Sequence, residues 1–400
     1  MLFDVRTYLR MFRLAFAERP RGGRLALLVA LALALPLLAA FHAVCMALDV
    51  LLFPGFRRVR VRAPVFIIGH ARSGTSLLHE LMSRDEAQFS TFLTWELFLP
   101  ALVQRKAVHA AAALDRRLLG GALARRVRAL EDRAFARGRE MHPMSLTRPE
   151  EDEFLFAATC ASGVWVLLFP YWRELQDLYY TDEMPARRRR RLMRFYRGCV
   201  QRQLWLNGPH KTHLSKNPTF CGKVESLIEA FPDARFVVCQ RTPYDTIPSL
   251  LKLMTRNWKA ARCRPERIED SRRVLAEQSF HTYRYPLEVL RRRPATHWTE
   301  VDYRALVDAP KRTVEGVYAA LALPLSPAYE KALEAEEARS RAHRAEHVYS
   351  LGEFGLQPGE IRARLADLFE RYGWPAEPPP APAQVASARR PPSTSPATRT

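Results

Sequence analysis

The run from Pro64 to His79 constrains the fold more than any other part of the chain. Its apolar residues Val65–Ile68 indicate a buried strand, Gly69–Gly74 form a short loop, and a helix begins at Thr75. In a strand–loop–helix unit of this kind, the loop N–H groups and the helix N-terminus converge and attract an anion. The run therefore predicts an α/β protein, a P-loop-type parallel sheet flanked by helices, with an anion-binding loop.

The loop has the spacing of a nucleotide-binding P-loop but lacks its lysine. Gly69 and Gly74 match the two glycines of that motif, and Ser76 stands at its Ser/Thr position. Thr75 takes the place of the lysine, and Arg72 supplies the strong positive charge. Because the lysine contacts the β/γ-phosphates of a nucleoside triphosphate, its loss predicts a phosphate ligand other than Mg–ATP.

A second strand–loop–helix unit follows later in the chain. Residues 235–239 indicate a buried strand, Arg241 stands in the next loop, and a helix is predicted over 244–254. Arg241 and Ser249 can face one anion if the arginine lies in the loop and the serine two turns into the helix. Two cationic loops predict a nucleotide with two separate phosphate groups.

The net charge of +20 over 400 residues favours a negatively charged partner or substrate. Arginine is used far more often than lysine, so compositional bias explains the scattered arginines. The run Arg187–Arg191 is interpreted as a solvated helix face, because no nucleic-acid-binding signature accompanies it. We expect no nucleic-acid partner. The six cysteines lack metal-ligand spacing, which predicts a reducing compartment and no bound metal.

Residues 1–24 are basic and residues 25–53 are almost wholly apolar, with further arginines at 57–62. The apolar segment is long enough to cross a bilayer once. Positive charge on both flanks and Pro36 near its middle favour instead a shallow re-entrant or interfacial hairpin, with both ends on the cytoplasmic face. A buried helix pair of the globular core is a third interpretation.

After these segments we predict one catalytic domain over 64–373. The composition of residues 374–400, rich in Pro, Ala, Ser and Thr, predicts a disordered tail.

The two loops together resemble those of a known family. The segment 65–78 is similar to the 5′-phosphosulfate-binding loop of sulfotransferases, and 236–249 is similar to their 3′-phosphate-binding motif. The arginine of the first loop resembles the branch that includes tyrosylprotein-type and bacterial enzymes, although Ala71 replaces the usual proline. The resemblance implies in-line transfer of a sulfuryl group from 3′-phosphoadenosine 5′-phosphosulfate (PAPS) to a hydroxyl or amine.

The resemblance also implies roles for individual residues. Lys216 corresponds to a lysine near the bridging oxygen of the donor, where it would stabilise the leaving phosphate together with Arg72. No metal is needed for this chemistry, because cationic side chains neutralise the leaving group. The donor itself would be held by the two loops, through Arg72, Ser73, Gly74, Thr75, Ser76, Arg241 and Ser249.

Three groups are candidates for the general base. Glu96 lies 24 residues after Arg72, a separation similar to that of the catalytic glutamate in related arginine-loop enzymes. Partial burial beside Trp95 would raise its pKa toward a useful value. The acidic run Glu150–Glu153 is the second candidate, although acids at a helix N-terminus explain it as well. His213 is the third and ranks below Glu96.

The sequence thus predicts a membrane-associated sulfotransferase that acts on a glycan, lipid or small-molecule acceptor. PAPS is made in the cytosol, which places the catalytic domain on the cytoplasmic side. A kinase or NTPase of the P-loop class is the first alternative, but the missing lysine argues against it. An inactive basic adaptor on anionic membranes is the second. The aromatic run 154–180 suits an apolar acceptor, and equally a packed core.

Overall fold

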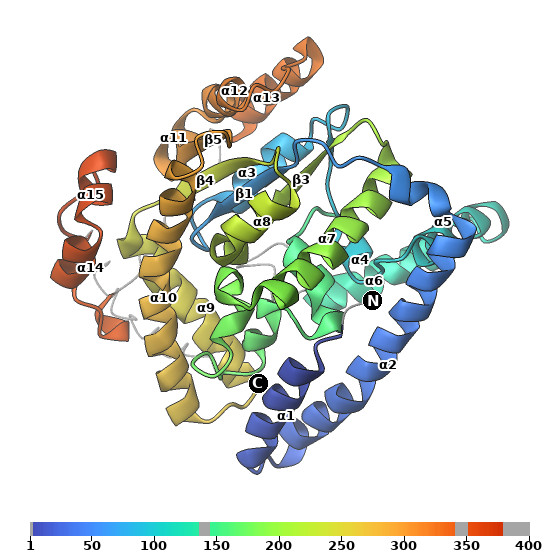
Figure 1. Cartoon of the computed structure of the whole chain (residues 1–400), viewed down its shortest axis with the longest axis horizontal. Helices are drawn as coiled ribbons and strands as arrows, with labels where there is room; N and C mark the ends of the chain where they lie inside the picture. Colours follow the sequence, from blue (N-terminus) through green and yellow to red (C-terminus); the bar gives the residue numbers. More distant parts are fainter. Residues whose placement is uncertain (1–2, 136–144, 341–350, 379–400) are drawn as a thin grey trace, which may run out of the picture.

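The computed structural model describes residues 3–135, 145–340 and 351–378, and Figure 1 shows its arrangement. Its sheet has five parallel strands in the order β2-β3-β1-β4-β5, which confirms the predicted α/β fold. The strands are β1 (Val65–Gly69), β2 (Phe89–Ser90), β3 (Thr212–Lys216), β4 (Arg235–Gln240) and β5 (Trp298–Asp302).

The sheet is buried on both faces because its strands alternate their side chains between two hydrophobic clusters. In β1, Phe66 and Ile68 belong to the larger cluster, and Val65 and Ile67 to the smaller one. A strand that is buried on both faces has a continuous run of apolar residues, which is why β1 could be predicted from the sequence. The larger cluster is shared with α7 (Ala186–Asn207), α8 (Val224–Ala230), α9 (Pro243–Ala260) and α10 (Pro265–Arg291).

The smaller cluster lies under the helices of the opposite face, α3 (Thr75–Ser83), α11 (Tyr303–Asp308), α12 (Pro310–Ala320) and α13 (Pro327–Ser340). The remaining elements flank the sheet: α1 (Val5–Ala17), α2 (Gly22–Leu52), η1 (Pro54–Arg58), α4 (Thr94–Leu97), α5 (Leu102–Leu118), α6 (Ala122–Phe135), η2 (Asp152–Thr159), η3 (Gly163–Leu167), η4 (Gln176–Leu178), η5 (Thr181–Glu183), η6 (Pro218–Lys223), η7 (Gly352–Phe354), α14 (Pro358–Arg364) and α15 (Ala366–Tyr372).

Nearly all of the apolar segment lies in one continuous helix, α2, which ends at Leu52, and the hairpin predicted around Pro36 is wrong. Proline has no N–H, so the carbonyl of Ala32, four residues earlier, lacks its helical donor. The hydroxyl of Tyr8 on α1 donates to this carbonyl at 2.7 Å and replaces the missing bond. Among the described residues, α2 is the one helix long and apolar enough to cross a membrane.

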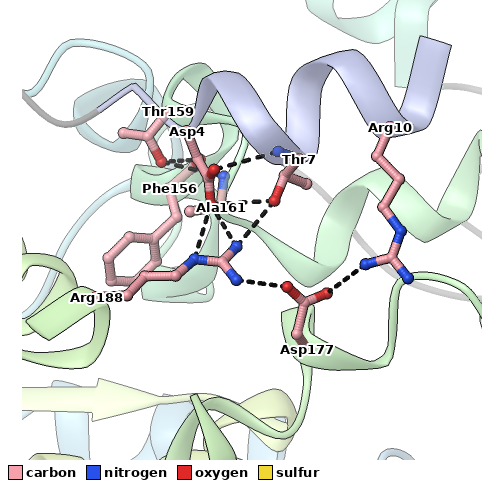
Figure 2. A network of polar contacts seen from close by, with 8 residues as sticks. All are labelled: Asp4, Thr7, Arg10, Phe156, Thr159, Ala161, Asp177 and Arg188. Carbon is pink, nitrogen blue, oxygen red and sulfur yellow. Dashed lines mark hydrogen bonds and ion pairs between the residues drawn. The ribbon is translucent and has the colours of Figure 1, made fainter. Parts of the chain in front are cut away.

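The chain turns earlier than predicted, between α1 and α2, and α1 is tied to the body of the protein. Figure 2 shows Asp4 at the start of α1 accepting a hydrogen bond from Nε of Arg188 on α7 at 3.1 Å. The other side of the same guanidinium donates to Asp177 at 2.5 Å, and Asp177 also pairs with Arg10 at 3.8 Å. Because α7 packs on the sheet, these contacts fix α1 against the domain.

The predicted tail begins too early at residue 374. Trp374 is buried in the larger cluster against Phe369, and the carbonyl of Ala376 accepts a hydrogen bond from Tyr244 at 2.9 Å. The Trp374 ring holds these residues against α15, and the bond from Tyr244 holds them against α9, in spite of their composition. The rest of the predicted tail, residues 379–400, lies outside the described residues.

Candidate active site

The first anion loop connects β1 to α3 and depends on its two glycines. Gly69 has φ +142°, and a Cβ there would lie 2.4 Å from the carbonyl oxygen of Cys239 on β4. Gly74 has φ +93°, and a Cβ would lie 2.6 Å from the ring of Tyr303. Both positions combine a left-handed backbone with a close neighbour, so they exclude other residues.

The loop leaves polar groups available for an anion. Gly74 is the N-cap of α3, so the first turn of this helix has no side-chain cap. Ser73 is fully buried, and its hydroxyl has no hydrogen-bond partner within the described part of the chain. Thr75 is buried and Ser76 is exposed at the start of α3. A buried hydroxyl without a partner beside an uncapped helix N-terminus fits a phosphate or sulfate group.

The second loop meets the first. Nε of Arg72 donates to the hydroxyl of Ser249 on α9 at 3.2 Å. The guanidinium of Arg241, which follows β4, donates to the carbonyl of Arg72 at 3.4 Å. The same guanidinium lies 4.2 Å from the ring centroid of Tyr303 and 3.2 Å from Asp245. The structure therefore brings Arg72, Arg241 and Ser249 together at one end of the sheet.

His70 braces the junction between the loops. Its ring stacks on Tyr283 of α10 with centroids 5.1 Å apart, and its Nε2 lies 2.9 Å from the hydroxyl of Ser279. The hydroxyl of Tyr283 donates to the carbonyl of Arg241 at 2.7 Å. Burial lowers the pKa of His70 to about 4, so the ring is neutral at physiological pH.

Lys216 lies at the end of β3, beside β1, where it pairs in register with Ile67. Its side chain is almost fully buried, and Nζ lies 3.1 Å from Glu150 and 3.0 Å from Glu151. Burial alone would lower the pKa of Lys216, but the two carboxylates outweigh it and raise the pKa above the ordinary value. The sequence did not indicate strand β3, because Leu214 is the one aliphatic residue among its five.

The acidic run 150–153 precedes and opens η2, and its carboxylates pair with side chains of β3 and η6. Asp152 lies 2.9 Å from Nε2 of His213, and Glu153 pairs with Lys223. Glu150 is also buried, whereas the side chain of Glu151 keeps 27% of its exposure. Glu151 is thus the member of the run that reaches both solvent and Lys216.

The two other candidates for the general base, Glu96 and His213, form buried hydrogen bonds away from the anion loops. Glu96 is buried, and its carboxylate accepts hydrogen bonds from the N–H of Leu93 at 2.8 Å and from Gln203 at 3.2 Å. These bonds cap α4 and join it to α7. His213 is fully buried, with Asp152 and the hydroxyl of Tyr196 on its Nε2. Neither side chain is joined to the anion loops by a hydrogen bond within the described residues.

Sequence reasoning did not identify His79, which lies on α3 near Lys216 and His213. Its Nε2 has no hydrogen-bond partner among the described residues. Burial, and to a lesser extent the positive charge of Lys216, lowers the pKa of His79 to about 3. In the sequence, His79 could have been noticed because it lies one helical turn after Thr75. In the described ranges no group of three or more His, Cys, Asp or Glu residues is arranged to hold a metal ion.

Comparisons with known proteins identify the family. A sequence model described as the sulfotransferase family matches residues 64–327. The omega-hydroxy-beta-dihydromenaquinone-9 sulfotransferase Stf3 of Mycobacterium bovis is 26% identical over 334 residues, which cover 78% of this chain and 75% of Stf3. The protein of the same name from Mycobacterium tuberculosis matches equally.

Two solved structures share the fold. Sulfotransferase STF9 from Mycobacterium avium superposes with a TM-score of 0.65 at 21% identity, covering 82% of this chain and 81% of STF9. Sulfotransferase STF1 from Mycobacterium tuberculosis gives a TM-score of 0.60 at 19% identity, covering 90% and 92%. With a family match over more than half of its length and the two joined anion loops, the chain belongs to the sulfotransferase family and is a transferase.

Proposed function

We propose that the protein binds PAPS across its two loops and transfers the sulfuryl group to an acceptor hydroxyl. The contact between Arg72 and Ser249 carries this proposal, because it sets the two anion-binding loops side by side. Arg72 and the residues Ser73–Ser76 would bind the 5′-phosphosulfate, and Arg241 with Ser249 the 3′-phosphate. The buried hydroxyl of Ser73, which has no hydrogen-bond partner among the described residues, would bind the phosphosulfate.

In the transfer step, the acceptor oxygen forms a bond to sulfur as the bond from sulfur to the bridging oxygen breaks. The bridging oxygen leaves on the 5′-phosphate, where its developing charge needs a nearby cation. Lys216 is suited to this role, since its raised pKa keeps it protonated and it lies next to β1. No step of this scheme requires a metal.

We assign the general base to Glu151. The acceptor proton must pass to a carboxylate that substrate can reach, and Glu151 is partly exposed while it contacts Lys216 at 3.0 Å. The contacts of Glu96 suit a positioning residue for α4 instead. Base and leaving-group lysine would thus lie next to each other beside the transferred group.

The acceptor is proposed to be the hydroxyl of a membrane lipid. The relative Stf3 is named for a hydroxylated menaquinone, and this chain carries a long apolar helix, α2. We propose that residues 25–53 associate with the membrane, and that the catalytic domain lies at its cytoplasmic face, where PAPS is available.

Calorimetric titration with 3′-phosphoadenosine 5′-phosphate (PAP) tests donor binding. Saturable binding to the wild type and its loss in Arg72→Ala and Arg241→Ala are expected. Wild-type protein that does not bind, or variants that bind unchanged, would contradict the proposal and favour the inactive adaptor.

A radiolabelled-donor assay with extracted membrane lipids tests the base and the acceptor class. We expect Glu151→Gln to lose about 10²–10⁴-fold in turnover while it retains PAP binding. Glu96→Gln should keep its turnover and lose thermal stability. If Glu96→Gln alone abolishes turnover at unchanged stability, the base is Glu96. Label that enters only water-soluble acceptors would refute a lipid acceptor.

A further inference from the structure

Helix α2 is fastened to the domain at both of its ends. Near the N-terminal end, Arg24 donates to the carbonyl of Ala261 at 2.9 Å and to Cys263 at 2.9 Å. Near the C-terminal end, the buried Asp49 pairs with Arg202 at 2.6 Å and accepts from the backbone N–H of Leu102 at 2.9 Å. These anchors are 25 residues apart, roughly 38 Å along a helix. A helix held in this way lies along the domain and does not project across a bilayer.

The opposite face of α2 is apolar and exposed. Its side chains recur at helical spacing, so they form one stripe along the outside of the molecule. Its strongly exposed members include Leu33 at 66%, Leu37 at 71%, Val44 at 60% and Leu51 at 75%. An apolar stripe that runs the length of a 31-residue helix is a surface that requires a partner.

The pair of helices α5 and α6 extends this surface. Helix α5 packs on α2, and Figure 1 shows α1, α2, α5 and α6 along the same side of the molecule. The buried Asp115 closes the pair by accepting from the N–H groups of Leu123 and Ala124 at 2.9 and 3.0 Å. The exposed apolar side chains of the α5–α6 pair lie around the turn between the two helices, called the tip, and along α6. They are Leu114, Leu118, Leu119, Leu123 and Leu130.

Exposed arginines lie among these leucines, and their charge indicates which kind of partner the surface binds. Arg116 and Arg117 precede the tip, and Arg125, Arg126 and Arg128 follow it on α6. A second copy of this chain would bring the same arginines against them, which is unfavourable. Mixed apolar and cationic side chains suit a bilayer whose headgroups are anionic.

The same surface approaches the candidate active site. Helix α2 packs against η2, which begins directly after Glu151. The exposed Phe98, which precedes α5, packs on Phe154 of η2 with centroids 5.9 Å apart. An acceptor that enters from this side would move along apolar rings toward Glu151 and Lys216.

We propose that the outer face of α2 and the α5–α6 pair form one docking surface for an anionic lipid bilayer, with α2 in the membrane plane. This inference rests on the proposed membrane association and adds the second contacting element and the orientation. Its failure is separable from that of the sulfotransferase function, because PAP binding is measured independently.

Sedimentation with phospholipid vesicles tests the surface. Wild-type protein should bind vesicles made of phosphatidylglycerol and phosphatidylcholine. Its binding to vesicles of pure phosphatidylcholine, or to the mixed vesicles at high salt, should be at least about tenfold weaker. Leu118→Asp/Leu119→Asp and Arg126→Glu/Arg128→Glu should each weaken binding about tenfold or more. The charge-matched control Arg312→Glu/Lys331→Glu, on α12 and α13, should bind like the wild type.

Each variant should bind PAP normally, which shows that it is folded. If the two α5–α6 variants sediment like the control, or if neutral and anionic vesicles bind equally, the proposal is overturned. Wild-type protein that binds PAP but no vesicles overturns it as well.

Thiol labelling tests the orientation of α2, because the native cysteines of the described residues are buried. In sealed vesicles carrying the full chain, cysteines introduced at Gly23 and Leu52 should both react from the side that exposes the catalytic domain. Reaction from opposite sides would show that α2 crosses the bilayer and would refute the in-plane orientation.

Discussion

The Nε atom of Arg72 donates a hydrogen bond to the hydroxyl of Ser249, although the two residues are 177 positions apart in the chain. Each of the two loops follows a strand of the same sheet, and this contact joins them into one binding region. It also explains why the serine lies two turns into α9, since from there its side chain reaches back to the first loop.

Removal of this hydroxyl should weaken recognition of the 3′-phosphate. We expect Ser249→Ala to bind PAP about tenfold more weakly and Arg241→Ala about a hundredfold, because a lost charge-assisted bond costs about 1.5–3 kcal/mol. Binding of adenosine 5′-phosphate, which has no 3′-phosphate, should change much less. Calorimetry with both nucleotides measures the difference, with Ser83→Ala at the C-terminal end of α3 as the control. Equal losses for the two nucleotides would contradict the assignment.

Gly74 should not tolerate a side chain. In Gly74→Ala the added Cβ meets the ring of Tyr303 at 2.6 Å in a left-handed backbone, so the loop must move. We expect a loss of about 1–3 kcal/mol in the free energy of unfolding and loss of PAP binding. The control is Gly316→Ala in α12, where no atom lies within 4 Å and alanine should be neutral or stabilising. Denaturant unfolding and calorimetry check both variants.

Replacement of Lys216 should separate stability from catalysis. Lys216→Met leaves the buried carboxylate of Glu150 without this cation, which should cost about 3–5 kcal/mol and abolish transfer. Lys216→Met/Glu150→Gln removes the isolated charge and should recover most of the stability while turnover remains absent. If the double variant regains activity, Lys216 does not stabilise the leaving group.

Acid should destabilise the protein partly through His79. Its pKa is about 3 in the folded chain and 6.5 ordinarily, so unfolding takes up a proton between these values. Stability contributed by the neutral ring is therefore present above pH 6.5 and declines by up to about 1.4 kcal/mol per pH unit below it. His79→Leu should flatten the pH profile of the unfolding free energy in this window, whereas the exposed His210→Leu should not. An unchanged slope in His79→Leu would refute the expectation.

The bond from Tyr8 to Ala32 should matter only while Pro36 is present. Tyr8→Phe should cost about 1 kcal/mol, because the Ala32 carbonyl then lacks both its helical donor and the hydroxyl. In a Pro36→Ala background the backbone N–H is restored, and the same substitution should cost much less. A double-mutant cycle on thermal unfolding measures the coupling, and purely additive effects would contradict it.

Much of the site could be predicted because its signals are local. The glycines at 69 and 74, the cation at 72 and the pair at 241 and 249 are set by what a phosphate-binding backbone requires. The order of the strands, which places β1 between β3 and β4, could not be predicted from these motifs. Strand β3 was missed because its polar residues are buried through pairs such as His213 with Asp152.

The sequence by itself determined the chemistry of the loops, since backbone conformation and helix starts depend on neighbouring residues. Only the tertiary structure decided which carboxylate meets Lys216, because the pairing of Glu151 with a strand 65 residues away depends on burial and packing. It likewise decided that α2 remains a single helix against the domain. Composition shows that a segment is apolar, but Tyr8, Arg24 and Asp49 supply the partners that determine where it lies.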